Sequence, residues 1–255
     1  MLRAHGVSDR GRIRPTNEDC YGIDHELRLC VIADGMGGHR AGEIAARMAV
    51  DTVIEYVGRS AVTTTWPFGF DQSISEAGNL LRTAVHVANA RIFEAACATP
   101  DYFGMGTTAV AVLERDGVLS VAHVGDSRLY VFADERLRQM TDDDSWAASV
   151  LARDPQLDPA ALQAHPMRNA LTNVVGSRPR TTVHLREHVL TGGELLVLTT
   201  DGVHGVLTEL SLAQVMEKGG DAKHIASGLI DAALANGSRD NCTAVVAEYF
   251  KNGIG

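Results

Sequence analysis

Four aspartates stand at the ends of apolar runs, where a strand would present a carboxylate at the rim of its sheet: Asp34, Asp126, Asp201 and Asp240. Glycine follows Asp34 and Asp201, and it lets the backbone turn sharply or approach a ligand closely. A single Asp-Gly pair is more often a turn whose aspartate caps its own backbone. Four carboxylates beside otherwise buried strands favour a common site instead.

The chemistry of such a site depends on whether the four rims converge. Like charges brought together raise one another's pKa unless a cation lies between them. Carboxylate and carbonyl oxygens, with neither a cysteine pair nor clustered histidines, suit Mg²⁺ or Mn²⁺ rather than zinc. The residues alone therefore predict a site for a hard divalent metal ion.

A second feature, near the N-terminus, could bind an anion. Arg10, Arg12 and Arg14 come just before the acidic pair Glu18-Asp19. The planar guanidinium of arginine matches two phosphate oxygens at once. A solvated charged turn explains the same residues, so both interpretations stay open at this point.

Composition limits the classes of partner. The chain has 255 residues, with 32 Asp and Glu against 23 Lys and Arg and a formal net charge of −9. Nucleic acid and anionic membranes require a basic face, so we expect neither as a partner. No apolar run approaches the roughly 20 residues that cross a bilayer, and the N-terminus lacks the apolar core of a secretory signal. We therefore expect a cytoplasmic protein without membrane insertion, and a monomer.

The elements that must position these residues follow from hydrophobic spacing. Short β-branched or alternating runs predict strands at residues 27–33, 107–113, 118–124, 129–132, 182–189, 195–200 and 243–249. Apolar residues at helical spacing predict helices at residues 41–57, 80–98, 210–217 and 224–235. Because strands and helices do not alternate one by one, the pattern favours an α+β fold in which helices flank largely antiparallel sheets. We predict one domain over residues 1–255, with a binding flap at about 141–181.

Six short motifs share their order with a known enzyme family. They are Arg14-Pro15-Thr16-Asn17-Glu18-Asp19, Ala33-Asp34-Gly35-Met36-Gly37-Gly38-His39, Gly104-Met105-Gly106-Thr107-Thr108, Val124-Gly125-Asp126-Ser127-Arg128, Thr200-Asp201-Gly202 and Asp240-Asn241. With them the sequence resembles the bacterial branch of the metal-dependent protein phosphatases, the PPM or PP2C-like family. The resemblance implies a β-sandwich of two antiparallel sheets flanked by paired α-helices. It also implies hydrolysis of phosphoserine and phosphothreonine on proteins by a metal-activated water. Such an enzyme would oppose a bacterial Ser/Thr kinase or act on partner-switching regulators, and the sequence does not choose between the two.

The resemblance assigns metal ligands residue by residue, for two core ions that are Mn²⁺ or Mg²⁺. It implies that Asp34 bridges both ions and that Gly35 offers its backbone carbonyl. Asp201 and Asp240 would hold the first ion, and Glu18 would support the second through water.

The same resemblance implies a third, weaker ion and two further roles. Asp126 together with Asp201 would hold the third ion. Arg14 would bind the substrate phosphate, and Asp19 would orient metal-bound water.

Two positions concern the surroundings of the metals. Asn241 is expected to buttress Asp240. Met36 stands where animal relatives have a histidine, and a methionine cannot donate a proton to the leaving group. The resemblance therefore leaves the general acid open between metal-bound water and His39.

Other chemistries fit the sequence less well. The segment Gly104-x-Gly106-x-x-Ala109 resembles a dinucleotide fingerprint, but it opens a β-branched run instead of a helix. No P-loop is present, and no cysteine is followed six residues later by the arginine of a cysteine-based phosphatase. Two rivals remain: a PP2C-fold binding or regulatory module with little or no catalysis, and a phosphatase of small phosphate esters.

Overall fold

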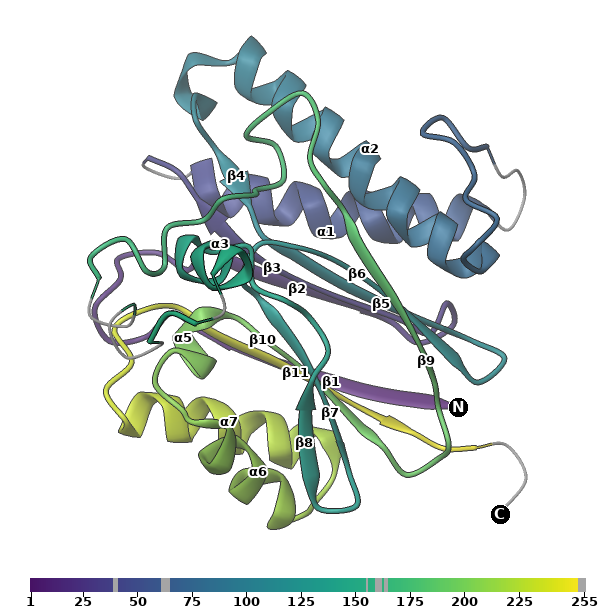
Figure 1. The fold of residues 1–255 in the computed structure, drawn as a ribbon, viewed down its shortest axis with the longest axis vertical. Coiled ribbons are helices and arrows are strands. Elements are labelled where there is room, and N and C mark those ends of the chain that lie inside the picture. Colours follow the sequence, from purple (N-terminus) through teal and green to yellow (C-terminus); the bar gives the residue numbers. More distant parts are fainter. Residues whose placement is uncertain (39–40, 61–64, 155, 159–161, 163–164, 252–255) are drawn as a thin grey trace.

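The structure has four layers. It is a computed structural model that describes residues 1–251 except 39–40, 61–64, 155, 159–161 and 163–164. Two sheets stack in the centre. Helices α1 (Ala41–Ser60) and α2 (Glu76–Ala98) cover one side, and α6 (Glu209–Glu217) and α7 (Ala222–Ala235) cover the other (Figure 1).

The first sheet has five antiparallel strands in the order β1-β11-β10-β7-β8. Their bounds are Leu2–Asp9 (β1), Cys242–Tyr249 (β11), Leu195–Thr199 (β10), Arg128–Ala133 (β7) and Arg136–Gln139 (β8). The first and last strands of the chain thus lie side by side, paired over all eight residues of β1.

The second sheet has the order β2-β3-β5-β6-β9, and the short strand β4 pairs with the end of β3. Their bounds are Asp19–Asp24 (β2), Leu29–Met36 (β3), Ala109–Arg115 (β5), Val118–Val124 (β6), His184–Val189 (β9) and Gly106–Thr107 (β4). All of these neighbours are antiparallel.

Alternation of side chains along each central strand explains the layering. In β3, Leu29, Val31 and Ala33 pack against α1 and α2, whereas Cys30 and Ile32 pack against the other sheet. Successive side chains of a strand point to opposite faces, so an all-apolar strand can be buried on both sides.

The first sheet repeats this pattern on its own two faces. In β10, Leu196 and Leu198 face the opposite sheet, while Val197 packs with Ile225 and Leu229 of α7. Three apolar cores therefore separate the four layers and hold the strand ends in fixed positions.

Three short elements lie in the connections: η1 (Pro100–Tyr102), α3 (Trp146–Arg153) and α5 (Asp201–His204). Helix α3 begins inside the expected flap, where the side chain of Ser145 caps it by accepting from the amide of Ala148 at 3.2 Å. Residues 155, 159–161 and 163–164 of the expected flap lie outside the described residues.

The α+β sandwich predicted from the sequence is confirmed, as are the four long helices. The prediction missed β1, β2, β8, α3 and α5. Strands β1 and β2 carry Gly6 and Gly22 among polar residues, which gives them little strand propensity of their own. Pairing with β11 and β3 makes them strands, and the glycines allow close contact: a Cβ at Gly6 would clash with the ring of Tyr21.

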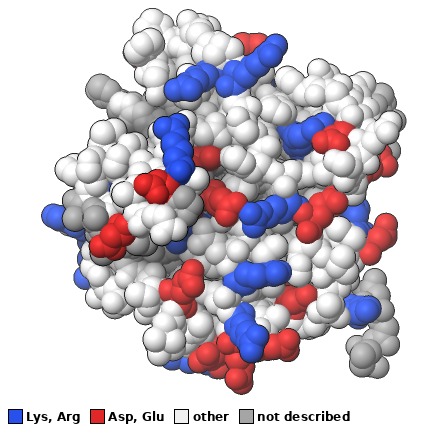
Figure 2. All heavy atoms as spheres, in the orientation of Figure 1, with Lys and Arg blue, Asp and Glu red and all other residues white. Residues whose placement is uncertain are grey.

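The surface carries both signs of charge. Acidic and basic side chains are interspersed over the face seen in Figure 2. Across the helices of the described residues, none combines the length and the apolar character that a bilayer span requires.

Candidate active site

The predicted site residues meet at one edge of the sandwich, near α5 in Figure 1. Asp19 and Asp34 are direct partners across β2 and β3. Asp201 follows β10 and Asp240 precedes β11, and these two strands are neighbours in the other sheet. In addition to burial, the negative charges of four other aspartates raise the pKa of Asp34: Asp19, Asp201, Asp126 and Asp240. We call these five residues the acidic cluster.

Two threonines fix the backbone of Asp34 at the end of β3. The amide of Asp34 donates to Oγ1 of Thr108 at 2.9 Å. In return, its carbonyl accepts from the amide of Thr108 at 2.8 Å and from Oγ1 of Thr107 at 2.9 Å. The Gly-Thr-Thr motif of the sequence thus has a positional role beside the cluster.

Asp19 lies between the two sheets and is held by two hydroxyls. Its Oδ2 accepts from Oγ1 of Thr243 at 2.6 Å and from Oγ1 of Thr200 at 2.9 Å. Its Oδ1 is buried and has no hydrogen-bond partner among the described residues. One oxygen of this carboxylate therefore anchors it, and the other remains available to a ligand.

Asp240 and Arg14 form the open side of the cluster. The guanidinium of Arg14 donates to Oδ2 of Asp240 at 2.6 Å, and the side chains are 52% and 36% exposed. This hydrogen bond raises the pKa of Arg14, so the guanidinium stays charged. Arg14 thus stands at the entrance with its charge accessible to solvent.

Asp201 occupies the first position of α5, directly after the buried end of β10. Its Oδ1 is also buried, and no described residue bonds to it. Together with Asp126 and Arg128, Asp201 lines a hollow of about 500 Å³. Asp126 itself follows Gly125, whose φ of +97° marks the tight turn between β6 and β7.

Glu18 and Gly35 lie where the N-terminal loop meets the start of α1. The amide of Gly35 donates to the carbonyl of Glu18 at 3.1 Å. A Cβ at Gly35 would clash with the carbonyl oxygen of Gly42, and one at Gly42 would lie 2.7 Å from Oε2 of Glu18. Glycine at both positions therefore lets the two backbone segments pack against each other, and it lets the carboxylate of Glu18 approach Gly42.

Burial and mutual repulsion dominate the electrostatics of the cluster. Burial raises the pKa of Asp19 and of Asp126 to about 7, with a further contribution from Asp201 in both cases. Burial also raises the pKa of Asp34 well above its ordinary value, and it raises that of Asp201, where Asp240 adds repulsion. Several carboxylates therefore share a small space in which they repel one another.

The donor atoms of this site fit a hard divalent ion. They are carboxylate and carbonyl oxygens, which Mg²⁺ and Mn²⁺ prefer, and two of them are the unpartnered buried oxygens of Asp19 and Asp201. In the described part of the chain, no three His, Cys, Asp or Glu side chains are placed to hold one ion by themselves. An ion here would take one or two carboxylates and complete its shell with carbonyl and water oxygens, as Mg²⁺ commonly does.

Comparison with known proteins decides the family. The sequence profile of Protein phosphatase 2C matches residues 14–228, which include the whole acidic cluster except Asp240. The chain belongs to the protein phosphatase 2C family.

Two bacterial phosphatases are similar to nearly the whole chain. The chain is 31% identical over 249 residues to the serine/threonine protein phosphatase PstP of Mycobacterium tuberculosis, covering 97% of this chain and 45% of PstP. It thus spans less than half the length of that relative. It is also 30% identical over 250 residues to the serine/threonine phosphatase stp of Listeria monocytogenes, covering 97% of this chain and 96% of stp.

A solved structure extends the similarity to three dimensions. The catalytic domain of PstP in complex with two manganese ions matches this structure with a TM-score of 0.82 at 29% identity. The match covers 98% of this chain and 99% of that one. The sandwich described above is therefore the protein phosphatase 2C fold.

The contacts of Asn241 differ from the expected support of Asp240 by its side chain, and the expectation for His39 is not tested. The side chain of Asn241 accepts from the amide of Glu18 at 2.8 Å and donates to the carbonyls of Arg10 and Thr16. It therefore shapes the N-terminal loop, and only its backbone amide contacts Asp240, at 2.9 Å. His39, which we considered as a general acid, lies outside the described residues.

Sequence reasoning missed the two threonines that hold Asp19. Thr200 directly precedes Asp201 in a motif that drew attention only for its aspartate, and Thr243 begins the last apolar run. Their hydroxyls become meaningful only when β10 and β11 are paired, because that pairing brings both to Asp19.

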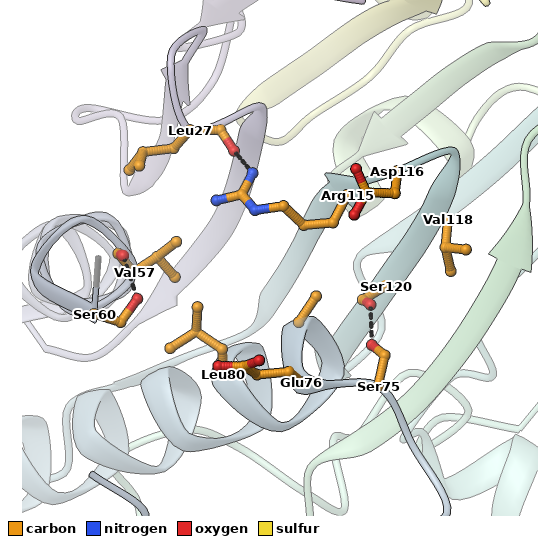
Figure 3. A pocket seen from close by; sticks show the side chains of 11 residues that line it. Leu27, Val57, Ser60, Ser75, Glu76, Leu80, Arg115, Asp116, Val118 and Ser120 are labelled. Atoms are coloured by element: carbon orange, nitrogen blue, oxygen red, sulfur yellow. Dashed lines mark hydrogen bonds between the residues drawn. The ribbon is translucent and has the colours of Figure 1, made fainter. Parts of the chain in front are cut away.

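A second hollow, of about 570 Å³, lies away from the cluster between the end of α1, the start of α2 and the β5–β6 turn (Figure 3). Several of its polar side chains are hydrogen-bonded within the hollow. Ser75 caps α2 and contacts Ser120, while Arg115 donates to the carbonyl of Leu27. Without a concentration of unbalanced charge, this hollow is not a candidate for phosphatase chemistry.

Proposed function

We propose that this protein hydrolyses phosphoserine and phosphothreonine on proteins and depends on divalent metal ions. The observation that carries the proposal is the acidic cluster beside the exposed cation of Arg14. Its buried carboxylates repel one another, and two of their oxygens have no hydrogen-bond partner among the described residues. Membership of the protein phosphatase 2C family supports it, as do relatives named as serine/threonine phosphatases.

Two core ions, Mn²⁺ or Mg²⁺, would be held by residues at the strand ends. Asp34 would serve both, with the carbonyl of Gly35 as a further ligand. Asp201 and Asp240 would hold the first ion, and Glu18 would support the second through water. The relative whose structure contains two manganese ions supports this number. Such ions would lower the pKa of a water and offset the charge of the phosphoryl oxygens.

Asp126, with Asp201, is proposed to hold a third and weaker ion. Both residues line the same hollow, and repulsion from Asp201 adds to the burial that raises the pKa of Asp126. Because Asp126 sits on a turn rather than at a paired strand end, its ion would be the most easily lost.

Arg14 and Asp19 would act directly on substrate and water. The half-exposed guanidinium of Arg14 can bind two phosphate oxygens while it stays close to Asp240. Asp19, anchored through Oδ2, can accept a hydrogen bond from the attacking water at Oδ1 and so orient it. Met36 cannot protonate the departing alkoxide, so that proton would come from water or from His39.

The test is turnover of para-nitrophenyl phosphate and of a phosphothreonine peptide, measured with Mn²⁺, with Mg²⁺ and with EDTA. We expect metal-dependent release of phosphate from both substrates and none above background with EDTA. No turnover above that of an Asp34→Asn variant would instead identify a binding or regulatory module. Faster hydrolysis of small phosphate esters than of any phosphopeptide would identify a phosphatase of small phosphate esters.

Phosphorylated proteins, and with them a Ser/Thr kinase whose work the enzyme reverses, are the proposed partners. Dephosphorylation of a kinase-treated protein extract, followed by mass spectrometry, would identify them.

A further inference from the structure

Asp144 lies just outside the acidic cluster, and its side chain bonds to three separate segments. Its Oδ2 accepts from the amide of Gly125 at 3.0 Å and from Nδ2 of Asn173 at 2.8 Å. Its Oδ1 pairs with Nε2 of His184 at 2.9 Å, and the side chain is only 14% exposed. One carboxylate thus joins the turn before Asp126, the far end of the 141–181 segment and the start of β9.

The backbone of Asp144 also bonds to the turn before Asp126 and to the far end of the 141–181 segment. Its amide donates to the carbonyl of Gly125 at 2.9 Å. Its carbonyl accepts from the amide and from Oγ1 of Thr172, at 2.8 and 3.0 Å. Next to it the two ends of the segment pair with each other, since the amide of Trp146 donates to the carbonyl of Ala170 at 2.8 Å. We call residues 144–146 and 170–173 the flap base.

The turn that carries Asp126 is held from two sides. On one side, Asp144 fixes both polar backbone groups of Gly125. On the other, Oγ of Ser127 bonds Oγ1 of Thr108 at 2.7 Å, and Thr108 also holds Asp34. The φ of +97° at Gly125 is open to few other residues, so small changes there would redirect Asp126.

We propose that Asp144 is a positioning residue: it sets the direction of Asp126 through Gly125 and thereby couples binding of the weakest metal ion to docking of the flap base. This inference rests on the proposed function, because it takes Asp126 as a ligand of that ion.

The size of the effect follows from the behaviour of groups that orient metal ligands. Replacing such a partner typically costs ten- to a hundredfold in metal affinity or activity. Coupling between two sites is also reciprocal, so an ion at Asp126 should stabilise the flap base as much as the base favours the ion.

The test compares Asp144→Ala with a matched control two residues earlier, in the same loop between β8 and α3. Asp142 forms an exposed ion pair with Arg186, its side chain being 78% exposed, so Asp142→Asn removes a charge without touching Gly125. Calorimetric titration with Mn²⁺ should show the two tighter ions unchanged in Asp144→Ala and the weakest ion bound roughly tenfold less tightly. Asp142→Asn should match the wild type.

Hydrogen exchange provides a readout that does not depend on activity. In the wild type, Mn²⁺ at a concentration that fills the weakest site should slow exchange at the amides of Asp144, Trp146 and Thr172. In Asp144→Ala this slowing should disappear, although the tighter ions still bind.

A second variant covers the case in which Asp144→Ala does not fold. Asn173→Ala removes one donor from Asp144 and leaves its link to Gly125 in place. Loss of one hydrogen bond to a charged group should weaken the last ion about fivefold.

The outcomes separate this inference from the proposed function. If the wild type lacks Mn²⁺-dependent turnover, the function fails. If the wild type is active but the folded variants, Asp144→Ala or Asn173→Ala, bind the weakest ion with wild-type affinity, the positioning role is wrong and the function stands. Equal slowing of exchange in wild type and Asp144→Ala would overturn the coupling.

Discussion

Buried carboxylates occur at both ends of the sandwich, and the two ends treat them in opposite ways. At the end that holds the β5–β6 turn, Glu114 accepts from Arg28 at 2.9 Å and from the amide of Gly117 at 2.8 Å. Glu194 accepts from the amides of Thr191 and Gly192 at 2.9 and 2.8 Å. Burial alone would raise the pKa of Glu194, but these donors leave it lowered.

At the other end, Oδ1 of Asp19 and Oδ1 of Asp201 are buried with no hydrogen-bond partner in the part of the chain that the structure describes. The pKa values of Asp19, Asp34, Asp126 and Asp201 are all raised, with burial as the largest cause. A buried acid that is satisfied stabilises a turn, whereas a group of unsatisfied acids costs stability until a cation arrives. Both groups are buried, so burial alone does not distinguish a structural acid from a functional one. The number of hydrogen-bond donors around the carboxylate does.

The largest effect should come from neutralising the cluster. We expect Asp34→Asn or Asp201→Asn to lower kcat/KM about a thousandfold or more, because transition-state stabilisation of several kcal/mol depends on the metal. The metal-free variants should melt at or above the wild-type temperature, since each removes a repelled charge. Near-normal Mn²⁺-dependent rates in either variant would contradict the assignment.

A pH scan of the metal-free protein should show the same contrast thermodynamically. The pKa values of Asp19 and Asp126 are raised to about 7, against about 3.9 in an unfolded chain. The folded state therefore binds more protons in this window, and stability that is fully present below pH 4 is lost as pH rises through 7. In EDTA the melting temperature should fall by roughly 5–10 °C between pH 5 and 8.

Manganese should remove most of that fall, because it replaces the protons as the balancing charge. Asp126→Asn should reduce the slope in EDTA, as it removes one of the two groups. A melting temperature that rises over this pH range in EDTA would refute the electrostatic account.

The satisfied end should respond in stability and not in catalysis. Glu194→Gln places an amide donor against the N–H groups of Thr191 and Gly192, so we expect a loss of about 2 kcal/mol in the free energy of unfolding. Denaturant melts would measure this loss. Mn²⁺-dependent kcat/KM should stay within about twofold of wild type at a temperature where both are folded. A large loss of activity in the folded variant would contradict a purely structural role for Glu194.

The smallest effect should come from the exposed entrance. Arg14→Ala should raise KM for a phosphopeptide about tenfold, a difference of about 1.4 kcal/mol, with a smaller effect on kcat. The exposed pair with Asp240 should contribute less than about 1 kcal/mol to stability. Arg12→Ala, an exposed neighbour in the same loop, is the control, and equal KM values for the two variants would exclude a specific role for Arg14.

Much of this could be predicted from the sequence, because strand ends carry local signals. The aspartates after the runs that became β3, β6 and β10, and the one before β11, were visible as polar residues interrupting apolar ones. Thr200, Thr243 and Asp144 carried no such signal. A hydroxyl or a carboxylate outside a motif becomes functional only through the partner that another segment brings to it.

The order of the motifs and the alternation of apolar residues determined the family, the layered sandwich and the acids at its rim, because both depend on spacing along the chain. Tertiary structure alone decided which carboxylates stay unsatisfied, how Asn241 folds the N-terminal loop, and that Asp144 joins the flap base to the turn of Asp126. Those outcomes depend on the distance between atoms of different segments, and only the packing of the two sheets fixes that distance.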